Sequence, residues 1–198
     1  MGVERNKEQR DNMQVREAID SRRAFRALAP VQISREIIMD LAKAASLSPS
    51  CFNHQPWRYI FVHDPDWLDR LKDALSRGNN WARKASLIIA VCSREDYDCV
   101  IDDRKMYQFD TGMATAFLIL RATELGMVAH PIAGYSDPMV REVLGIPHST
   151  KLICLVVVGK HDPSATDKLS EKQKESENQR PGRKAFREFC SMDEYGFR

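Results

Sequence analysis

The sequence predicts a mixed fold, in which helices and strands share one domain. Three apolar runs, at residues 58–62, 86–92 and 152–158, have the length and composition of buried strands. Stretches with apolar residues at helical spacing lie before and between them. A chain of 198 residues is the size of one domain with a sizeable core. We therefore expect a single domain over residues 1–198.

Capping residues mark the ends of the expected helices. Ser34 and Asp64 are suited to the N-cap position, and Gly126 and Gly145 to the residue after a helix. Trp67 lies on an apolar helical face and is expected in the core. The helices are expected at about residues 6–21, 34–47, 64–77, 107–125 and 137–144.

Composition and charge argue against several classes of protein. The net charge is +2, and basic and acidic residues are mixed along the chain, which does not favour a nucleic-acid partner. No signal peptide and no apolar stretch long enough to span a bilayer is visible, so we expect no membrane partner and a cytoplasmic location. The five cysteines include no C-x-x-C pair and the histidines are scattered. We therefore expect a reducing compartment, no structural disulfide and no metal site.

The C-terminal part, residues 161–198, differs in composition from the rest. It is highly charged and poor in apolar residues as far as Gln179, so it has no core of its own. Arg180 and Arg183 follow, and then the apolar Phe186 and Phe189. Two interpretations stay open: an extended arm that wraps around a partner subunit, and a disordered tail.

The loop at residues 48–57 separates an expected helix from an expected strand. Its prolines, serines and amides end the helix and offer many hydrogen-bonding groups to a ligand. The alternative is a connection whose polar side chains only satisfy their own backbone. The charged segment 93–105 has two interpretations as well: a cover over an active site, or a plain surface loop.

Four stretches resemble one known family in the same order. They are Ser-Arg-Arg-Ala-Phe-Arg at 21–26, Pro-Ser-x-x-Asn-x-Gln-Pro-Trp at 49–57, Leu-Gly-Met leading into Pro-Ile-Ala-Gly-Tyr at 125–135, and Leu-Gly-Ile-Pro at 144–147. Together they make the chain similar to the nitroreductase family of FMN-dependent NAD(P)H oxidoreductases, over about residues 15–190.

The resemblance implies an α+β fold, namely an α/β/α sandwich with a mostly antiparallel central sheet. It also implies a homodimer with two FMN sites at the interface and the C-terminal arm of each subunit on its partner. In such dimers the Arg22–Arg26 and Pro131–Gly134 groups belong to one subunit, and the Pro49–Asn53 loop belongs to the other.

The resemblance also implies which residues contact FMN. Arginines hold the phosphate, the loop amides face the flavin edge, and the turn at 131–134 lies against the ring. Ala24 stands where the family usually has Ser, which removes one hydroxyl contact. Asn79 and Asn80 are weaker candidates, and His130 is expected to be structural. The full expected set is Arg22, Arg23, Ala24, Arg26, Pro49, Ser50, Cys51, Asn53, Gln55, Pro131, Ile132, Ala133, Gly134, Arg180 and Arg183.

The function implied is hydride transfer from NADH or NADPH, bound transiently, through FMN to a nitroaromatic, a quinone or a similar small molecule. No catalytic side chain is expected, because the reactive atom is N5 of the flavin. No Gly-x-Gly-x-x-Gly motif for a resident nicotinamide cofactor is present. The alternatives are a non-enzymatic protein that binds or stores flavin, and an arginine cluster that is only a solvated basic face.

Overall fold

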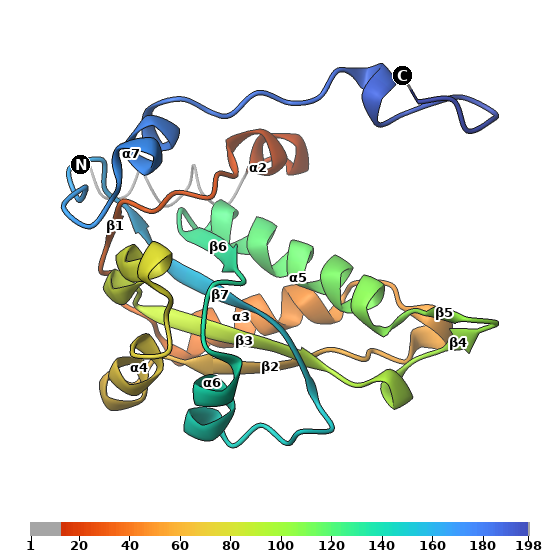
Figure 1. Cartoon of the computed structure of the whole chain (residues 1–198), viewed down its shortest axis with the longest axis horizontal. Helices are drawn as coiled ribbons and strands as arrows, with labels where there is room; N and C mark the ends of the chain where they lie inside the picture. Colours follow the sequence, from red (N-terminus) through yellow and green to blue (C-terminus); the bar gives the residue numbers. More distant parts are fainter. Residues whose placement is uncertain (1–12, 198) are drawn as a thin grey trace.

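A five-stranded antiparallel sheet forms the centre of the computed structural model, which describes residues 13–197 (Figure 1). The strand order is β1 (Leu28–Ala29), β7 (Lys151–His161), β3 (Leu87–Ser93) and β2 (Arg58–Val62). β6 (Val128–Ile132) pairs with β7 alongside β1, because β6 meets residues 155–159 of β7 and β1 meets residues 160–161. The expected strands at 58–62, 86–92 and 152–158 are thus confirmed, and β7 is the longest of them.

Helices cover both faces of the sheet. The alternating side chains of β3 and β7 point to opposite faces, so each strand contributes to two separate cores. On one face, α4 (Pro65–Lys72), α6 (Asp137–Leu144) and the 3₁₀ helix η2 (Arg77–Lys84) pack around Leu71 and Trp81. On the other face, α3 (Arg35–Ser46) and α5 (Tyr107–Glu124) pack around Leu41 and Leu118. The expected α+β sandwich with an antiparallel sheet is confirmed.

The expected caps form as predicted, and Gly126 follows α5 with φ of 73°. The Ser34 hydroxyl accepts a hydrogen bond from the Ile37 N–H, and the Asp64 carboxylate accepts two in the first turn of α4. Gly145 ends α6 with φ of 65°, a conformation that glycine adopts without strain. α2 (Val15–Ser21) is the described part of the helix expected at 6–21, and residues 6–12 lie outside the described residues.

Two expectations about α4 are wrong. The helix ends at Lys72 instead of continuing to residue 77, because the chain turns into η2 and buries Trp81. Trp67 is 45% exposed, and the guanidinium of Arg70 lies 4.7 Å from the centre of its ring. The cation gives the exposed indole a partner on the surface.

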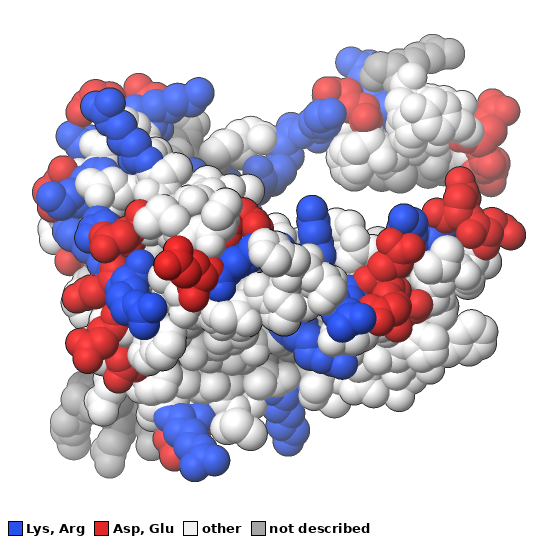
Figure 2. Space-filling view, turned by 60° about the horizontal axis from the view of Figure 1, so that its bottom comes forward, with Lys and Arg blue, Asp and Glu red and all other residues white. Residues whose placement is uncertain are grey.

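The C-terminal part is folded as far as Asn178. α7 (Glu171–Asn178) begins with a capping box between Ser170 and Gln173, and both Leu169 and Glu177 are buried. A composition without a core of its own is therefore compatible with a helix that packs on the rest of the domain. Beyond Gln179 the chain runs away from the sandwich to the short 3₁₀ helix η4 (Phe186–Glu188), and Figure 2 shows open space between the end of this arm and the body.

Among residues 13–197, no helix is both long enough and apolar enough to cross a membrane.

Candidate functional site

An arginine-lined cavity of about 190 Å³ lies where the segment after α2 meets α7 and the arm. Arg22, Arg23 and Arg26 come from the first of these segments, and Arg180 and Arg183 come from the arm. The remaining lining residues are Ala24, Ser176 and Pro181. The structure thus brings together six of the expected FMN-contacting residues. They come from two segments that are more than 150 positions apart in the sequence.

The charge of this cavity is not neutralised within the described part of the chain. No acidic side chain lines it, and none of its five arginines forms an ion pair with a described carboxylate. Partial burial lowers the pKa of Arg22, and the charges of Arg180 and Arg183 lower it further. Clustered guanidinium groups bind phosphate in a bidentate manner, so the cavity is suited to a phosphate group.

Glu177 of α7 holds the backbone of the arginine segment, residues 22–26, by hydrogen bonds. Its carboxylate accepts hydrogen bonds from the N–H of Arg26 at 2.7 Å and of Ala27 at 3.2 Å. His161, at the end of β7, lies 3.4 Å from the same carboxylate, and its ring stacks on Phe25. Because Glu177 is almost fully buried, these are charge-assisted hydrogen bonds shielded from water.

Ser176 is a site residue that the sequence analysis missed. Its carbonyl oxygen accepts a hydrogen bond from Arg23 at 2.6 Å, and its hydroxyl accepts one from Arg26 at 3.2 Å. The hydroxyl absent at Ala24 therefore has a counterpart in the same cavity, supplied by α7. The capping box at Ser170 is the sequence signal that predicts this helix.

The expected turn at 131–134 lies against η2. Asn79 donates a side-chain hydrogen bond to the Gly134 carbonyl oxygen at 2.9 Å, and the Ser76 N–H donates to the same oxygen at 3.0 Å. A Cβ atom on residue 134 would lie 2.6 Å from both Asn79 Nδ2 and Ser76 Oγ, so any other residue here would displace these two side chains. Asn79, one of the two weaker candidates, is thus placed beside the turn.

His130 precedes this turn and is buried. Its Nδ1 lies 3.1 Å from the Phe25 carbonyl oxygen, and its ring packs on Trp81. Burial lowers the pKa of His130 to about 4, so the imidazole is neutral at pH 7. These contacts give His130 the structural environment that was expected.

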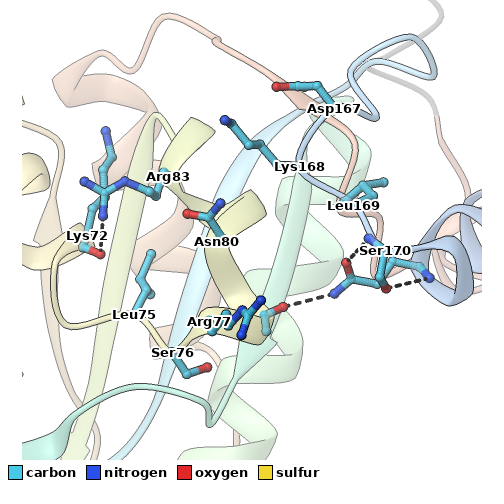
Figure 3. Close-up of a pocket in the computed structure, with 12 residues that line it drawn as sticks. Lys72, Leu75, Ser76, Arg77, Asn80, Arg83, Asp167, Lys168, Leu169 and Ser170 are labelled. Carbon is cyan, nitrogen blue, oxygen red and sulfur yellow. Dashed lines mark hydrogen bonds between the residues drawn. The ribbon is translucent and has the colours of Figure 1, made fainter.

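A larger open cavity of about 760 Å³ lies between η2 and the segment before α7 (Figure 3). Its walls carry four basic side chains, of which Arg83 donates a hydrogen bond to the Lys72 carbonyl oxygen. Gln173 closes one side by donating to the Gly78 carbonyl oxygen at 3.0 Å. Asn80 lines this cavity, whereas Asn79 points to Gly134, so the two weaker candidates face different surroundings.

The loop after α3 has a strained backbone. Phe52, Asn53 and Gln55 all have positive φ angles, a conformation that costs non-glycine residues about 1–3 kcal/mol each. The Ser50 hydroxyl accepts a hydrogen bond from the Gln55 N–H at 2.9 Å, so part of the loop's polar capacity serves its own backbone. The side chains of Asn53 and Gln55 are exposed, and strain of this kind is concentrated at ligand-binding loops.

The structure contains a disulfide bond between Cys51 and Cys99, so the expectation of no disulfide is wrong. The two cysteines are 48 positions apart, and only the folded chain brings their Cα atoms to 6.0 Å. Asp98, whose pKa is raised by burial and by the nearby carboxylate of Asp110, lies directly beside the bond. Of the three remaining cysteines, Cys92 is buried, and Cys154 and Cys190 are partly buried.

One chain does not assemble all the expected residues in one place. The loop at 49–55 is joined through Cys99 to the hairpin of β4 (Val100–Ile101) and β5 (Arg104–Lys105), whereas the arginine cavity lies near β1. These two regions are at opposite ends of the sandwich in Figure 1. Pro131, Ile132 and Ala133 belong to β6 and the turn after it, between the two.

The model of the nitroreductase family matches residues 19–105 and 77–160 of this chain, which together are more than half of its length. The chain belongs to the nitroreductase family. The match confirms the resemblance seen in the four sequence stretches.

Individual members of the family agree with this assignment. A protein of Archaeoglobus fulgidus named as an NADH dehydrogenase/NAD(P)H nitroreductase is 33% identical over 150 residues, which covers 71% of this chain and 82% of that protein. The iodotyrosine deiodinase of Haliscomenobacter hydrossis is 28% identical over 171 residues, which covers 71% and 76% of the two chains. A crystal structure described as an oxidoreductase containing FMN is 26% identical with a TM-score of 0.78, and covers 91% of this chain and 92% of that one. The expected nitroreductase-like fold is therefore confirmed.

Proposed function

We propose that this nitroreductase-family protein is an FMN-dependent oxidoreductase that transfers hydride from NADH or NADPH to a small-molecule acceptor. The observation that carries the proposal is the cavity with five arginines and no carboxylate. The names of the A. fulgidus relative and of the FMN-containing structure support the choice of donor and cofactor.

The residues present fit the phosphate end of FMN. Three arginines of one segment and two of the arm surround the cavity, and Ser176 adds a hydroxyl. Each charge-assisted hydrogen bond from an arginine to phosphate contributes about 1.5–3 kcal/mol. The hydrogen bonds that the Arg26 and Ala27 N–H groups donate to the Glu177 carboxylate hold the arginine segment in place before the ligand binds. A preformed cavity of this kind reduces the entropy lost on binding.

FMN, when bound, accepts hydride from the nicotinamide and passes electrons to the acceptor. The chain's own residues bind and orient the cofactor. The arginines neutralise its phosphate, and Asn53 and Gln55 of the strained loop offer amide donors to its polar edge. Asn79 and the Ser76 N–H hold the Gly134 carbonyl oxygen, so the turn that would lie against the ring is fixed before the ligand binds.

A homodimer completes this arrangement. The loop at 49–55 and the arginine cavity are far apart in one chain. A single binding site can therefore contain both of them only if each comes from a different chain. Apolar side chains of α2, α3 and α5 are exposed, among them Val15 at 73% and Leu47 at 70%, around an apolar groove of about 430 Å³. The arm also exposes Phe186 and Phe189. Both surfaces support an interface with a second copy, because apolar patches of this extent are usually covered.

The acceptor is proposed only as a class, namely nitroaromatic compounds, quinones or related acceptors. The non-enzymatic alternative, a protein that binds or stores flavin, shares the arginine cavity and differs only in the absence of hydride transfer.

The test is the anaerobic reaction of the purified holoprotein. We expect a yellow protein whose flavin absorption bleaches on mixing with NADH or NADPH and returns on adding a quinone or a nitroaromatic compound. Protein that binds FMN and is reduced by neither nicotinamide would support the flavin-storing alternative. Protein that takes up no FMN would overturn both.

A further inference from the structure

Four potential metal ligands converge beside the Cys51–Cys99 bond, away from the arginine cavity. Cys51 and His54 form a Cys-x-x-His pair in the strained loop, and Asp98 and Cys99 are neighbours in the segment before β4. A sulfur of each cysteine and a carboxylate oxygen of Asp98 all lie within 4.8 Å of one another. His54 Nδ1 lies 3.6 Å from Cys99 Sγ and 3.6 Å from Asp98 Oδ1.

These separations suit a tetrahedral zinc ion. With Zn–S of about 2.3 Å and Zn–N and Zn–O of about 2.0–2.1 Å, tetrahedral ligands lie about 3.6 Å apart for sulfur and nitrogen and about 3.4 Å apart for nitrogen and oxygen. The observed distances from His54 are close to these values. Two thiolates, an imidazole and a carboxylate are also ligand types that Zn²⁺ accepts together.

The buried carboxylate of Asp98 is a second, independent indication that a cation binds here. Its side chain is fully buried, and Oδ1 accepts a hydrogen bond from the Cys99 N–H at 2.8 Å. Oδ2 is buried and has no hydrogen-bond partner among the described residues. The Asp110 carboxylate lies beside Asp98 as well, so a cation bound by the Asp98 carboxylate would offset both the unpartnered oxygen and the repulsion between the two acidic groups.

We propose that the reduced form of this cluster, Cys51, His54, Asp98 and Cys99, binds one Zn²⁺ ion, and that the disulfide form does not. A small dithiol reduces the bond by two electrons, so the two sulfurs become thiols and the dithiol becomes a disulfide. Zn²⁺ then binds as both thiols lose their protons to solvent. His54, whose side chain is 46% exposed, gives the ion a route from solvent.

The site connects metal binding to the loop expected to face the flavin. In the reduced, zinc-bound form the ion replaces the covalent bond as the link between that loop and the hairpin of β4 and β5. The Cys51 N–H also donates to Asp110 Oδ2 at 2.7 Å, which anchors the same loop to the first turn of α5. The loop therefore keeps one anchor in both forms while the other changes from disulfide to metal.

The test uses Co²⁺ as a spectroscopic substitute for Zn²⁺ in full-length protein. Wild-type protein is reduced with a dithiol, freed of the reductant under anaerobic conditions and titrated with Co²⁺; untreated protein is titrated in parallel. We expect one Co²⁺ per chain with sulfur-to-cobalt charge-transfer absorption in the reduced protein only, and displacement of Co²⁺ by Zn²⁺. Reduced wild-type protein without thiolate absorption would overturn the proposal, and this comparison needs no substitution.

Variants then identify the ligands. Cys99→Ser should lose about half or more of the charge-transfer absorption, since one of two thiolate ligands is removed, and His54→Ala should lower the affinity by at least about 10-fold. Cys190→Ser is the matched control, because Cys190 lies in the arm outside the cluster. An unchanged Co²⁺ spectrum in Cys99→Ser would refute the cysteine ligands, and unchanged affinity in His54→Ala would refute the four-ligand site.

Discussion

Replacing Glu177 with Gln tests whether α7 holds the arginine segment. The carboxylate accepts the N–H groups of Arg26 and Ala27, one on each oxygen, at 2.7 and 3.2 Å. Glutamine has one oxygen and one amide NH₂ group, so it can accept only one of the two. The other backbone N–H stays buried without an acceptor, which costs about 1–3 kcal/mol. For a chain of this size the melting temperature should fall by roughly 2–12 °C.

The measurement is thermal unfolding of the FMN-free protein, because bound ligand would add its own stabilisation. Glu175→Gln is the matched control: Glu175 is on the same helix, and it is exposed. A Glu177→Gln protein as stable as Glu175→Gln would refute the reasoning, since the two hydrogen bonds would then contribute nothing measurable. The sequence alone gives no reason to expect a difference between these two glutamates.

Three further predictions concern the cofactor, pH and the arm. Arg22→Ala should weaken FMN binding roughly 10- to 150-fold, the equivalent of one charge-assisted contact, at unchanged thermal stability; equal weakening in Arg16→Ala, on the exposed face of α2, would contradict this. Between pH 6.5 and about 4, His130 is protonated in the unfolded chain but stays neutral in the folded protein. The free energy of unfolding of the wild type should therefore fall by up to about 3 kcal/mol on acidification, and that of His130→Gln should fall less. Identical pH profiles of urea unfolding in the two proteins would count against this prediction. A chain ending at Gln179 should sediment as a monomer with weakened FMN binding, and a truncated protein that stays dimeric and yellow would show that the arm is dispensable.

Local sequence patterns predicted the elements of this fold well. Strand β2 has the expected bounds, and Ser34 and Gly145 cap their helices as predicted, because those signals depend on residues within one turn. The helical spacing of Trp67 predicted a buried side chain, but the buried tryptophan is Trp81. The fold decides, because η2 packs against the sheet while Trp67 faces outward.

The residues of the candidate site were predicted through the resemblance to the nitroreductase family. Arginines at 22, 23 and 26 and at 180 and 183 were expected together, and they line one cavity. Whether FMN occupies it, with the loop of a second chain, stays a prediction. Ser176 and the Cys51–Cys99 bond were missed for one reason: each contact joins segments far apart in sequence, and no local pattern records such a contact.

The phosphate dependence of flavin binding tests the central claim most directly. FMN and riboflavin differ only by the phosphate, so their dissociation constants should be measured for the wild type and for Arg22→Ala. We predict that the wild type binds FMN at least about 10-fold more tightly than riboflavin, and that Arg22→Ala reduces this ratio while riboflavin binding is unchanged. Equal affinities of the wild type for FMN and riboflavin would contradict the assignment of the arginine cavity to the phosphate.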